Sequence, residues 1–105
     1  METYIQVVTT AGQKGDAEKI ARTLVEKKLA ACVQILGPIT STYRWKGNME
    51  TAEEWQCVIK SRKDLYKDIE KAIKAVHSYE VPEIIATPIT AGSGDYLDWL
   101  QGELG

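Results

Sequence analysis

The sequence ITSTYRW at residues 39–45 alternates between two faces with a period of two, and this stretch decides the fold. Such alternation is typical of a β-strand, and it extends back to residue 31 around an interruption at Gly37-Pro38. Lys46-Gly47-Asn48 then has the composition of a turn, and residues 54–60 alternate again. The sequence therefore predicts two strands, at residues 31–45 and 54–60, that form a hairpin.

Segments with clear periodicity flank this hairpin on both sides. Residues 16–28 place apolar side chains at helical spacing, with Asp16 where an N-cap oxygen is useful. Ser61-Arg62-Lys63-Asp64 has the spacing of a second helix N-terminus. In chain order we predict a strand at 4–10, a helix at 16–28, the hairpin, a helix from 61 to about 77, a strand at 82–89 and a short helix at 96–104 capped by Ser93 or Asp95.

This order of elements predicts an α+β fold. A β-α-β-β-α-β succession is typical of a ferredoxin-like antiparallel sheet with both helices on one face, here followed by a C-terminal helix. Strands two and four are the edges of such a sheet, and Pro38 and Pro88 fall on those two strands. Edge strands tolerate a residue that lacks an N–H. With 105 residues the chain is expected to form a single domain over residues 1–105.

Composition and charge narrow the classes of partner. Thirteen basic and fifteen acidic residues give a formal net charge of -2, which argues against a general electrostatic grip on nucleic acid or anionic lipid. No apolar stretch is long enough to cross a membrane, and the first residues lack the pattern of a secretory signal. Cys32 and Cys57 are interpreted as free thiols, so we expect a cytoplasmic protein.

The predicted hairpin is long for a small domain. A strand over residues 31–45 spans about 50 Å at ~3.3 Å per residue, whereas a domain of about 100 residues has a radius of gyration near ~13 Å. A projecting hairpin that carries Tyr43, Trp45 and Trp55 exposes aromatic surface and strand edges, which a partner usually covers. We therefore expect a homo-oligomer. The alternative is that Gly37-Pro38 folds the hairpin back onto its own domain.

The aromatic side chains of the hairpin also permit a second interpretation, in which they line a small-molecule cleft. We predict a cleft or interface position for Tyr79, Tyr43, Trp45, Trp55 and Lys60. Of the two, an interface is favoured for the hairpin aromatics, because such residues are enriched in interface cores. The pair Glu53-Glu54 is interpreted as solvated surface.

His77 is the only histidine and the strongest candidate for metal chemistry. It lies within seven residues of Tyr79, Glu80 and Glu83. One histidine with one carboxylate supplies half of a Cu(II) or Zn(II) site, which an oligomer interface could complete. The alternative is a structural histidine that hydrogen-bonds carbonyls at the helix end. No P-loop, C-x-x-C or H-E-x-x-H motif is present, so we expect no enzyme and no tightly bound cofactor.

Four segments carry a resemblance to a known family: KLAAC at 28–32, STYRWKG at 41–47, HSYEVPEI at 77–84 and YLDWL at 96–100. In this order they resemble the CutA family of divalent-cation tolerance proteins, over essentially the whole chain. The resemblance implies a ferredoxin-like subunit in a tight, cytoplasmic homotrimer whose hairpins join subunits. It also implies a role in copper tolerance, and we expect that role to be non-enzymatic.

The resemblance bears on the metal ligands as well. The family's suggested Cu(II) ligands are a cysteine at the end of strand one and a His-His pair after helix two. In this chain Thr9 stands at the cysteine position, Val76 at the first histidine and His77 at the second. A hydroxyl and an isopropyl group do not replace a thiolate and an imidazole. We therefore expect weak divalent-cation binding at inter-subunit clefts, with His77 and Glu83 as ligands. The alternative is a small-molecule sensor similar to the PII group, which also forms trimers of ferredoxin-like subunits.

Overall fold

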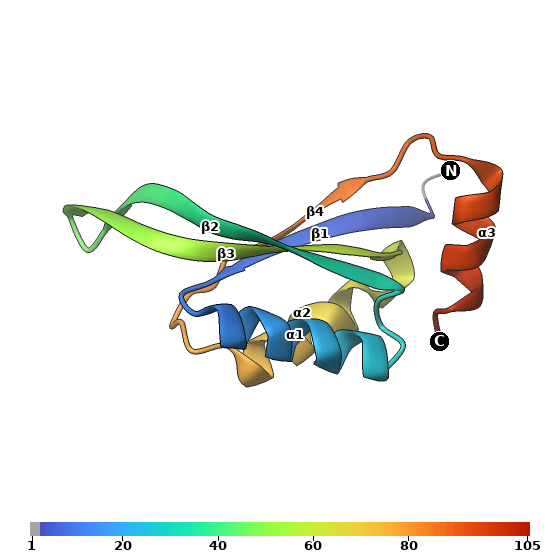
Figure 1. The fold of residues 1–105 in the computed structure, drawn as a ribbon, viewed down its shortest axis with the longest axis horizontal. Coiled ribbons are helices and arrows are strands. Elements are labelled where there is room, and N and C mark those ends of the chain that lie inside the picture. The colour runs from blue at the N-terminus through green and yellow to red at the C-terminus, as the bar shows by residue number, and fades with distance from the viewer. Residues whose placement is uncertain (1–2) are drawn as a thin grey trace.

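Two helices cover one face of a four-stranded antiparallel sheet in the computed structural model, which describes residues 3–105 (Figure 1). The elements are β1 (Tyr4–Ala11), α1 (Lys14–Glu26), β2 (Cys32–Trp45), β3 (Asn48–Arg62), a 3-10 turn (Lys63–Leu65), α2 (Tyr66–Val76), β4 (Ile84–Pro88) and α3 (Gly94–Gly102). The strands lie in the order β2-β3-β1-β4. The predicted α+β, ferredoxin-like fold is confirmed, and Pro38 and Pro88 do lie on edge strands.

The hydrophobic core lies between the sheet and the two helices that cover it. Val7 of β1 and Ile59 of β3 pair across the ladder and contribute side chains to this core. Because strand residues alternate between faces, Thr9 and Cys57 also point inward, and both are fully buried. The large side chains with at most 1% of their surface exposed include Ile20, Leu24, Ile59, Ile69, Ile73 and Leu100.

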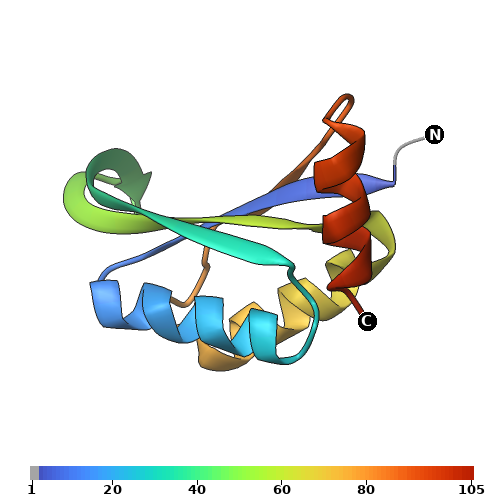
Figure 2. The same ribbon diagram turned by 45° about the vertical axis from the view of Figure 1, so that its right-hand side comes forward.

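The opposite face of the sheet carries a strip of apolar side chains. The register pairs Val8 with both Val58 and Ile85, so these three side chains lie together on the face opposite that of the buried Val7 and Ile59. α1 and α2 both lie on the other side of the sheet (Figures 1 and 2). Leu36 lies on the same face as Val58, since its pairing partner Gln56 is two residues from Val58. Ile85 is 54% exposed and Leu36 48% exposed. This strip, Val8, Leu36, Val58 and Ile85, is called the open face below.

The β2–β3 hairpin extends beyond the helices at one end of the molecule (Figure 1). Its ladder runs to the pair Leu36–Gln56 and resumes at Ile39–Glu54, so Gly37 and Pro38 form an irregularity in β2. The molecule is accordingly elongated, with extents of 44 × 25 × 23 Å. The hairpin therefore projects as predicted, and the alternative that Gly37-Pro38 folds it back onto the domain is wrong.

Two elements in the first half of the chain begin more than one residue before the predicted position. α1 begins at Lys14 with Gln13 at the N-cap position, so Asp16 lies in the first turn rather than at the cap. Its negative charge is favourable there because it faces the positive end of the helix dipole. β3 begins at Asn48 instead of residue 54, since residues 48–53 continue the ladder with β2 although their side chains are mostly exposed.

The predicted helix N-terminus at Ser61 is also wrong. Ser61 belongs to β3, and its hydroxyl donates a hydrogen bond to the Leu29 carbonyl oxygen at 2.6 Å. The helical segment starts two residues later, at the 3-10 turn. By contrast one of the two predicted caps of α3 is confirmed: Ser93 is the cap, because its Oγ accepts a hydrogen bond from the Tyr96 N–H at 3.2 Å, and Asp95 lies in the first turn.

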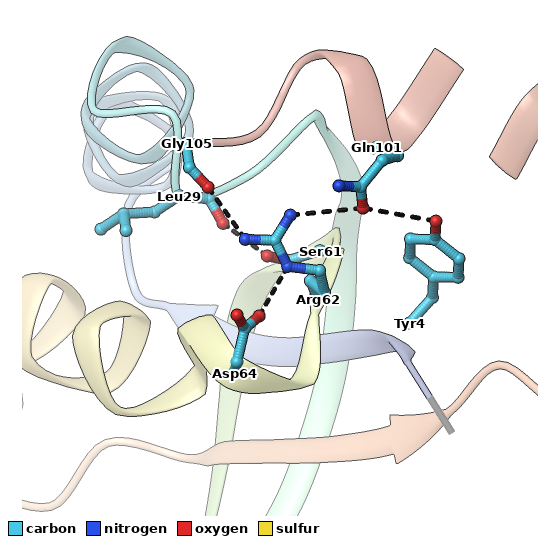
Figure 3. Close-up of polar contacts among 7 residues, drawn as sticks. All are labelled: Tyr4, Leu29, Ser61, Arg62, Asp64, Gln101 and Gly105. Carbon is cyan, nitrogen blue, oxygen red and sulfur yellow. Dashed lines mark hydrogen bonds and ion pairs between the residues drawn. The ribbon is translucent and has the colours of Figure 1, made fainter. Parts of the chain in front are cut away.

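Arg62 connects α3 and the residues after it to the end of the sheet (Figure 3). Its Nε donates to Asp64 Oδ1 at 2.6 Å, which orients the guanidinium. Nη1 then donates to Gln101 Oε1 at 3.3 Å, and Nη2 donates to the Gly105 carbonyl oxygen at 2.8 Å. The planar fork of arginine thus joins the end of β3 to the C-terminal segment, which lies about 40 residues away in the sequence.

Replacing Arg62 with Ala is expected to lower the free energy of unfolding by about 1.5–3 kcal/mol, because charge-assisted hydrogen bonds contribute at that level when they are partly buried. Urea denaturation measures the change, and limited proteolysis should cut the α3 segment sooner in the variant. Lys63→Ala removes a neighbouring exposed charge and serves as the control. Equal denaturation midpoints for Arg62→Ala and Lys63→Ala would show that the hydrogen bonds of Arg62 contribute nothing to the free energy of unfolding.

Candidate functional site

A cleft of about 730 Å³ lies between the projecting hairpin and the loop that joins α2 to β4. Residues from β1, β2 and β3 form one side of it, and residues 78–83 form the other. Its lining consists of Thr10, Ser41, Thr42, Tyr43, Trp45, Glu54, Ser78, Tyr79, Glu80, Val81 and Glu83. Three of these side chains are carboxylates, and none is Lys, Arg or His.

Glu54 and Tyr79 join the two sides of the cleft. The Tyr79 hydroxyl donates to Glu54 Oε2 at 2.8 Å, and Glu54 is only 6% exposed. Burial raises the pKa of the Tyr79 phenol well above its ordinary value, and the hydrogen bond to Glu54 and the charges of Glu54 and Asp16 raise it further. Tyr79 is therefore protonated over the neutral range and acts as the donor of this bond.

His77 holds the loop between α2 and β4 in place through two hydrogen bonds. Its Nε2 lies 2.6 Å from the Thr10 carbonyl oxygen, and its Nδ1 accepts a hydrogen bond from the Tyr79 N–H at 3.0 Å. Because Nδ1 is the acceptor, Nε2 carries the proton and donates to Thr10. The imidazole and the Tyr79 ring also pack at a centroid distance of 4.8 Å. The ring of His77 thus ties the loop after α2 to β1.

This arrangement leaves no nitrogen lone pair of His77 free for a metal ion. Within residues 3–105 no group of three or more His, Cys, Asp or Glu side chains is placed to hold one. Thr9, at the position where the resemblance places a cysteine, points into the core, and its buried Oγ1 has no hydrogen-bond partner in that part of the chain. The single chain in this conformation therefore does not fit a tightly bound metal.

The structure brings together only part of the predicted cleft-or-interface set. Tyr43, Trp45 and Tyr79 line the cleft with Glu83. Trp55 instead packs against the core and against Gly37 on the helix side of the hairpin. Lys60 lies at the other end of β3, opposite Cys32, and donates to Gln34 Oε1 at 2.7 Å. An interface role for these residues stays a prediction.

Glu54 and Thr10 were missed as site residues by sequence reasoning. The interpretation of Glu53-Glu54 as solvated surface is wrong for Glu54, which is buried against Tyr79. The alternation of β3 correctly separates Glu54 from the core face, but it carries no sign that residue 79 covers it. The sequence shows only a carboxylate at residue 54 and, 25 residues later, a tyrosine in a predicted loop. That signal is too weak to predict the hydrogen bond between Glu54 and Tyr79.

The cysteines are both free thiols, and they differ in their surroundings. Cys57 is fully buried, and its Sγ donates to the Ala17 carbonyl oxygen at 3.6 Å. Burial raises the pKa of Cys57 from 9.0 to about 11. The thiolate is the reactive form of cysteine. Because each pKa unit is a factor of ten, this shift lowers the fraction of Cys57 present as thiolate at neutral pH about a hundredfold.

We expect the Cys32→Ser variant, whose single thiol is Cys57, to resist a thiol reagent such as dithionitrobenzoate at pH near 8. The native variant should release almost no thionitrobenzoate, and the same sample unfolded in guanidinium chloride should release one equivalent per chain. Cys57→Ser is the matched control for Cys32. Rapid, full modification of native Cys32→Ser would contradict the burial of Cys57.

Element order, sheet order and the cleft beside a long hairpin define the chain as a ferredoxin-like α+β subunit with an extended β2–β3 arm. The chain belongs to the family described as CutA1 divalent ion tolerance protein, whose model matches residues 5–103. The family predicted from the four motifs is thus confirmed. No helix within residues 3–105 has both the length and the apolar character needed to span a membrane.

Relatives from distant organisms are similar over most of the chain. The divalent-cation tolerance protein CutA of Thermus thermophilus is 40% identical over 99 residues, which cover 94% of this chain and 96% of the relative. Protein CutA, chloroplastic, of Arabidopsis thaliana is 41% identical over 92% of this chain, but the chain spans only 53% of that protein. The solved structure of CutA1 from Oryza sativa superposes with a TM-score of 0.96 at 38% identity, covering 99% of this chain and 95% of that one.

Proposed function

We propose that the protein serves in divalent-cation tolerance, copper included, as a non-enzymatic homotrimer that binds divalent cations weakly at its clefts. Family membership supports the role in tolerance. The observation that carries the binding proposal is the acidic lining of the cleft, with Glu54, Glu80 and Glu83 and no basic side chain. Carboxylates at an open surface attract a divalent cation, and with few ligands they bind it weakly.

Glu83 is the proposed metal contact of this cleft, and His77 joins it only after releasing a backbone partner. Each nitrogen of His77 holds one hydrogen bond, to Thr10 or from Tyr79. Ligation by His77 would therefore cost one of these bonds, which is a reason to expect weak binding. A neighbouring subunit would have to supply further ligands to complete the coordination sphere.

The homotrimer is supported by the open face and by the free sheet edges. Ile85 and Leu36 expose about half of their surface on the side of the sheet away from α1 and α2, and exposed apolar strips of this kind are usually covered by a partner. Both β2 and β4 are edge strands with unpaired backbone groups, which a second copy can pair with. We propose a cytoplasmic location in addition, which fits the two free thiols and is tested by cell fractionation.

Calorimetric titration with Cu(II) tests the metal part of the proposal. We expect wild-type protein to bind Cu(II) with a dissociation constant above about 1 μM, a value that corresponds to a binding free energy of about −8 kcal/mol. Glu83→Gln should weaken binding severalfold, and His77→Ala should weaken it if the ring is recruited. Glu53→Gln, on the exposed side of the hairpin, is the control. No Cu(II) heat with wild-type protein would refute the metal site.

Light scattering tests the assembly. The wild-type mass should be three times that of the 11.7 kDa chain, and Ile85→Lys, which places a charge on the open face, should yield monomers. Trp45→Ala tests whether the end of the hairpin also holds subunits together. A wild-type mass of one chain would refute the homotrimer.

The PII-like alternative, a small-molecule sensor, is less favoured by the same cleft. A nucleotide carries phosphate groups, and three carboxylates without a basic side chain repel them. A nucleotide that raises the melting temperature would nevertheless favour this alternative, because ligands that bind the native state stabilise it.

A further inference from the structure

Glu54 is a buried carboxylate without a positive partner. Its exposed fraction is 6%, and its hydrogen bond within residues 3–105 comes from the neutral Tyr79 hydroxyl. The ion pairs in that part of the chain are Arg62–Asp64 and Lys74–Glu70, and neither involves it. A buried charge is costly unless it is paired and hydrogen-bonded. A cationic ligand bound at this site would therefore supply the positive partner that Glu54 lacks.

The walls around Glu54 are aromatic and partly open. Tyr43 is 44% exposed and Trp45 is 39% exposed, and both line the cleft together with Tyr79. The Lys46 ammonium lies 5.7 Å from the centroid of the Trp45 ring, so the indole already attracts a cation of its own chain. Aromatic faces beside a carboxylate favour organic cations, through cation–π attraction and burial of the methylene groups.

The donor set at Glu54 suits an organic cation better than a metal ion or an anion. A metal ion requires several ligand atoms at about 2–2.5 Å, and no group of three or more His, Cys, Asp or Glu side chains in residues 3–105 is placed to hold one. An anion would meet three carboxylates. An alkylammonium or alkylguanidinium needs only one carboxylate, hydroxyl acceptors such as Thr10 and Ser41, and an apolar wall.

We propose that Glu54, Tyr79, Tyr43 and Trp45 form a binding site for a small organic cation with an ammonium or guanidinium head. The head pairs with the Glu54 carboxylate at the buried side of the cleft, and the alkyl body lies against Tyr43 and Trp45. Tyr79 is a positioning residue, since its hydroxyl holds Glu54 in place. This site goes beyond the proposed metal contact, because it uses Glu54 and not Glu83 or His77.

Calorimetric titration of the wild-type assembly with butylguanidinium chloride and butylammonium chloride tests the proposal. At least one of the two should bind saturably, while pentanamide, which has similar length and no charge, should not. Glu54→Gln should weaken binding at least tenfold, since its amide still accepts from Tyr79 but carries no charge. Glu53→Gln makes the same charge change next door, on the exposed opposite face of β3, and should leave binding unchanged. Tyr79→Phe should weaken binding less than Glu54→Gln does.

Several results would overturn the organic-cation site. One is no saturable heat for either cation with folded wild-type protein, and another is equal affinity in wild type and Glu54→Gln. A third is dissociation of the assembly in Glu54→Gln without any cation binding to wild type, which would make Glu54 a contact to a basic side chain of a second copy. Parallel titrations with Cu(II) keep the proposals apart, since Glu54→Gln should weaken organic-cation binding at least tenfold and leave most of the Cu(II) heat.

Discussion

Replacing Ile73 with Ala is expected to lower the free energy of unfolding by about 2–5 kcal/mol, the largest single effect we predict for this protein. Ile73 lies on the buried side of α2, has no exposed surface and belongs to the core between the helices and the sheet. The loss combines the transfer free energy of the deleted carbons with the cavity that they leave. Because a small domain has about 5–15 kcal/mol in total, such a variant approaches the limit of folding.

Urea denaturation at one fixed chain concentration measures this effect, since assembly makes stability depend on concentration. Ile73→Val removes a single methyl group and should cost about 0.5–1.5 kcal/mol, which provides a graded control. Ala75→Gly, at an exposed position of the same helix, reports the cost of helix propensity alone, about 1 kcal/mol. A loss for Ile73→Ala no larger than that of Ala75→Gly would show that the core is not packed as described.

The second large effect is expected for Gly37→Val in the hairpin. A β-carbon at residue 37 would lie 2.4 Å from Cδ1 and 2.8 Å from Cγ of Trp55. These are the ring atoms nearest the backbone, so the indole cannot swing aside without leaving its place against the core. Overpacking typically costs 1–3 kcal/mol, and for this close contact with a branched side chain we expect about 3 kcal/mol.

The matched control is Gly15→Ala in α1, where a new β-carbon meets no atom within 4 Å. That change should be neutral or stabilising by up to about 1 kcal/mol, because Ala is the better helix former. The double variant Gly37→Val/Trp55→Ala should be less unstable than the sum of the single changes, since they share one contact. Strict additivity would show that the cost of Gly37→Val arises elsewhere.

Local chemistry made much of the fold predictable. Pro38 and Pro88 lack the N–H that an interior strand needs, so their positions identified the two edges before the sheet order was known. The serine before α3 was recognisable as a cap because its spacing to the first turn is a local property. Ser61 has the same local chemistry, but a distant carbonyl, that of Leu29, takes its hydroxyl. Tertiary contacts determine which of the two serines caps a helix, and these contacts cannot be predicted from the local sequence.

The candidate site was predictable only in part, for the same reason. Tyr43, Trp45 and Tyr79 belonged to the predicted cleft-or-interface set and Glu83 was a predicted metal ligand, and all four line the cleft. The burial of Glu54 depends on Tyr79, which lies 25 residues away in the chain. The two hydrogen bonds of His77 depend on the path of the loop after α2. Neither arrangement follows from periodicity or from residue type.

The central position of β1 has a consequence for how the chain reaches this structure during synthesis. β1 comes first in the sequence, yet its ladder partners are β3 and β4, so Thr9 pairs with Cys57 on one side and Ile84 on the other. Local pairs form faster than pairs between distant residues, and the β2–β3 hairpin is closed by a short turn. We expect the β2–β3 hairpin to form on the nascent chain before β4 has left the ribosome, when one edge of β1 is still unpaired. The first strand made is therefore among the last to be completed.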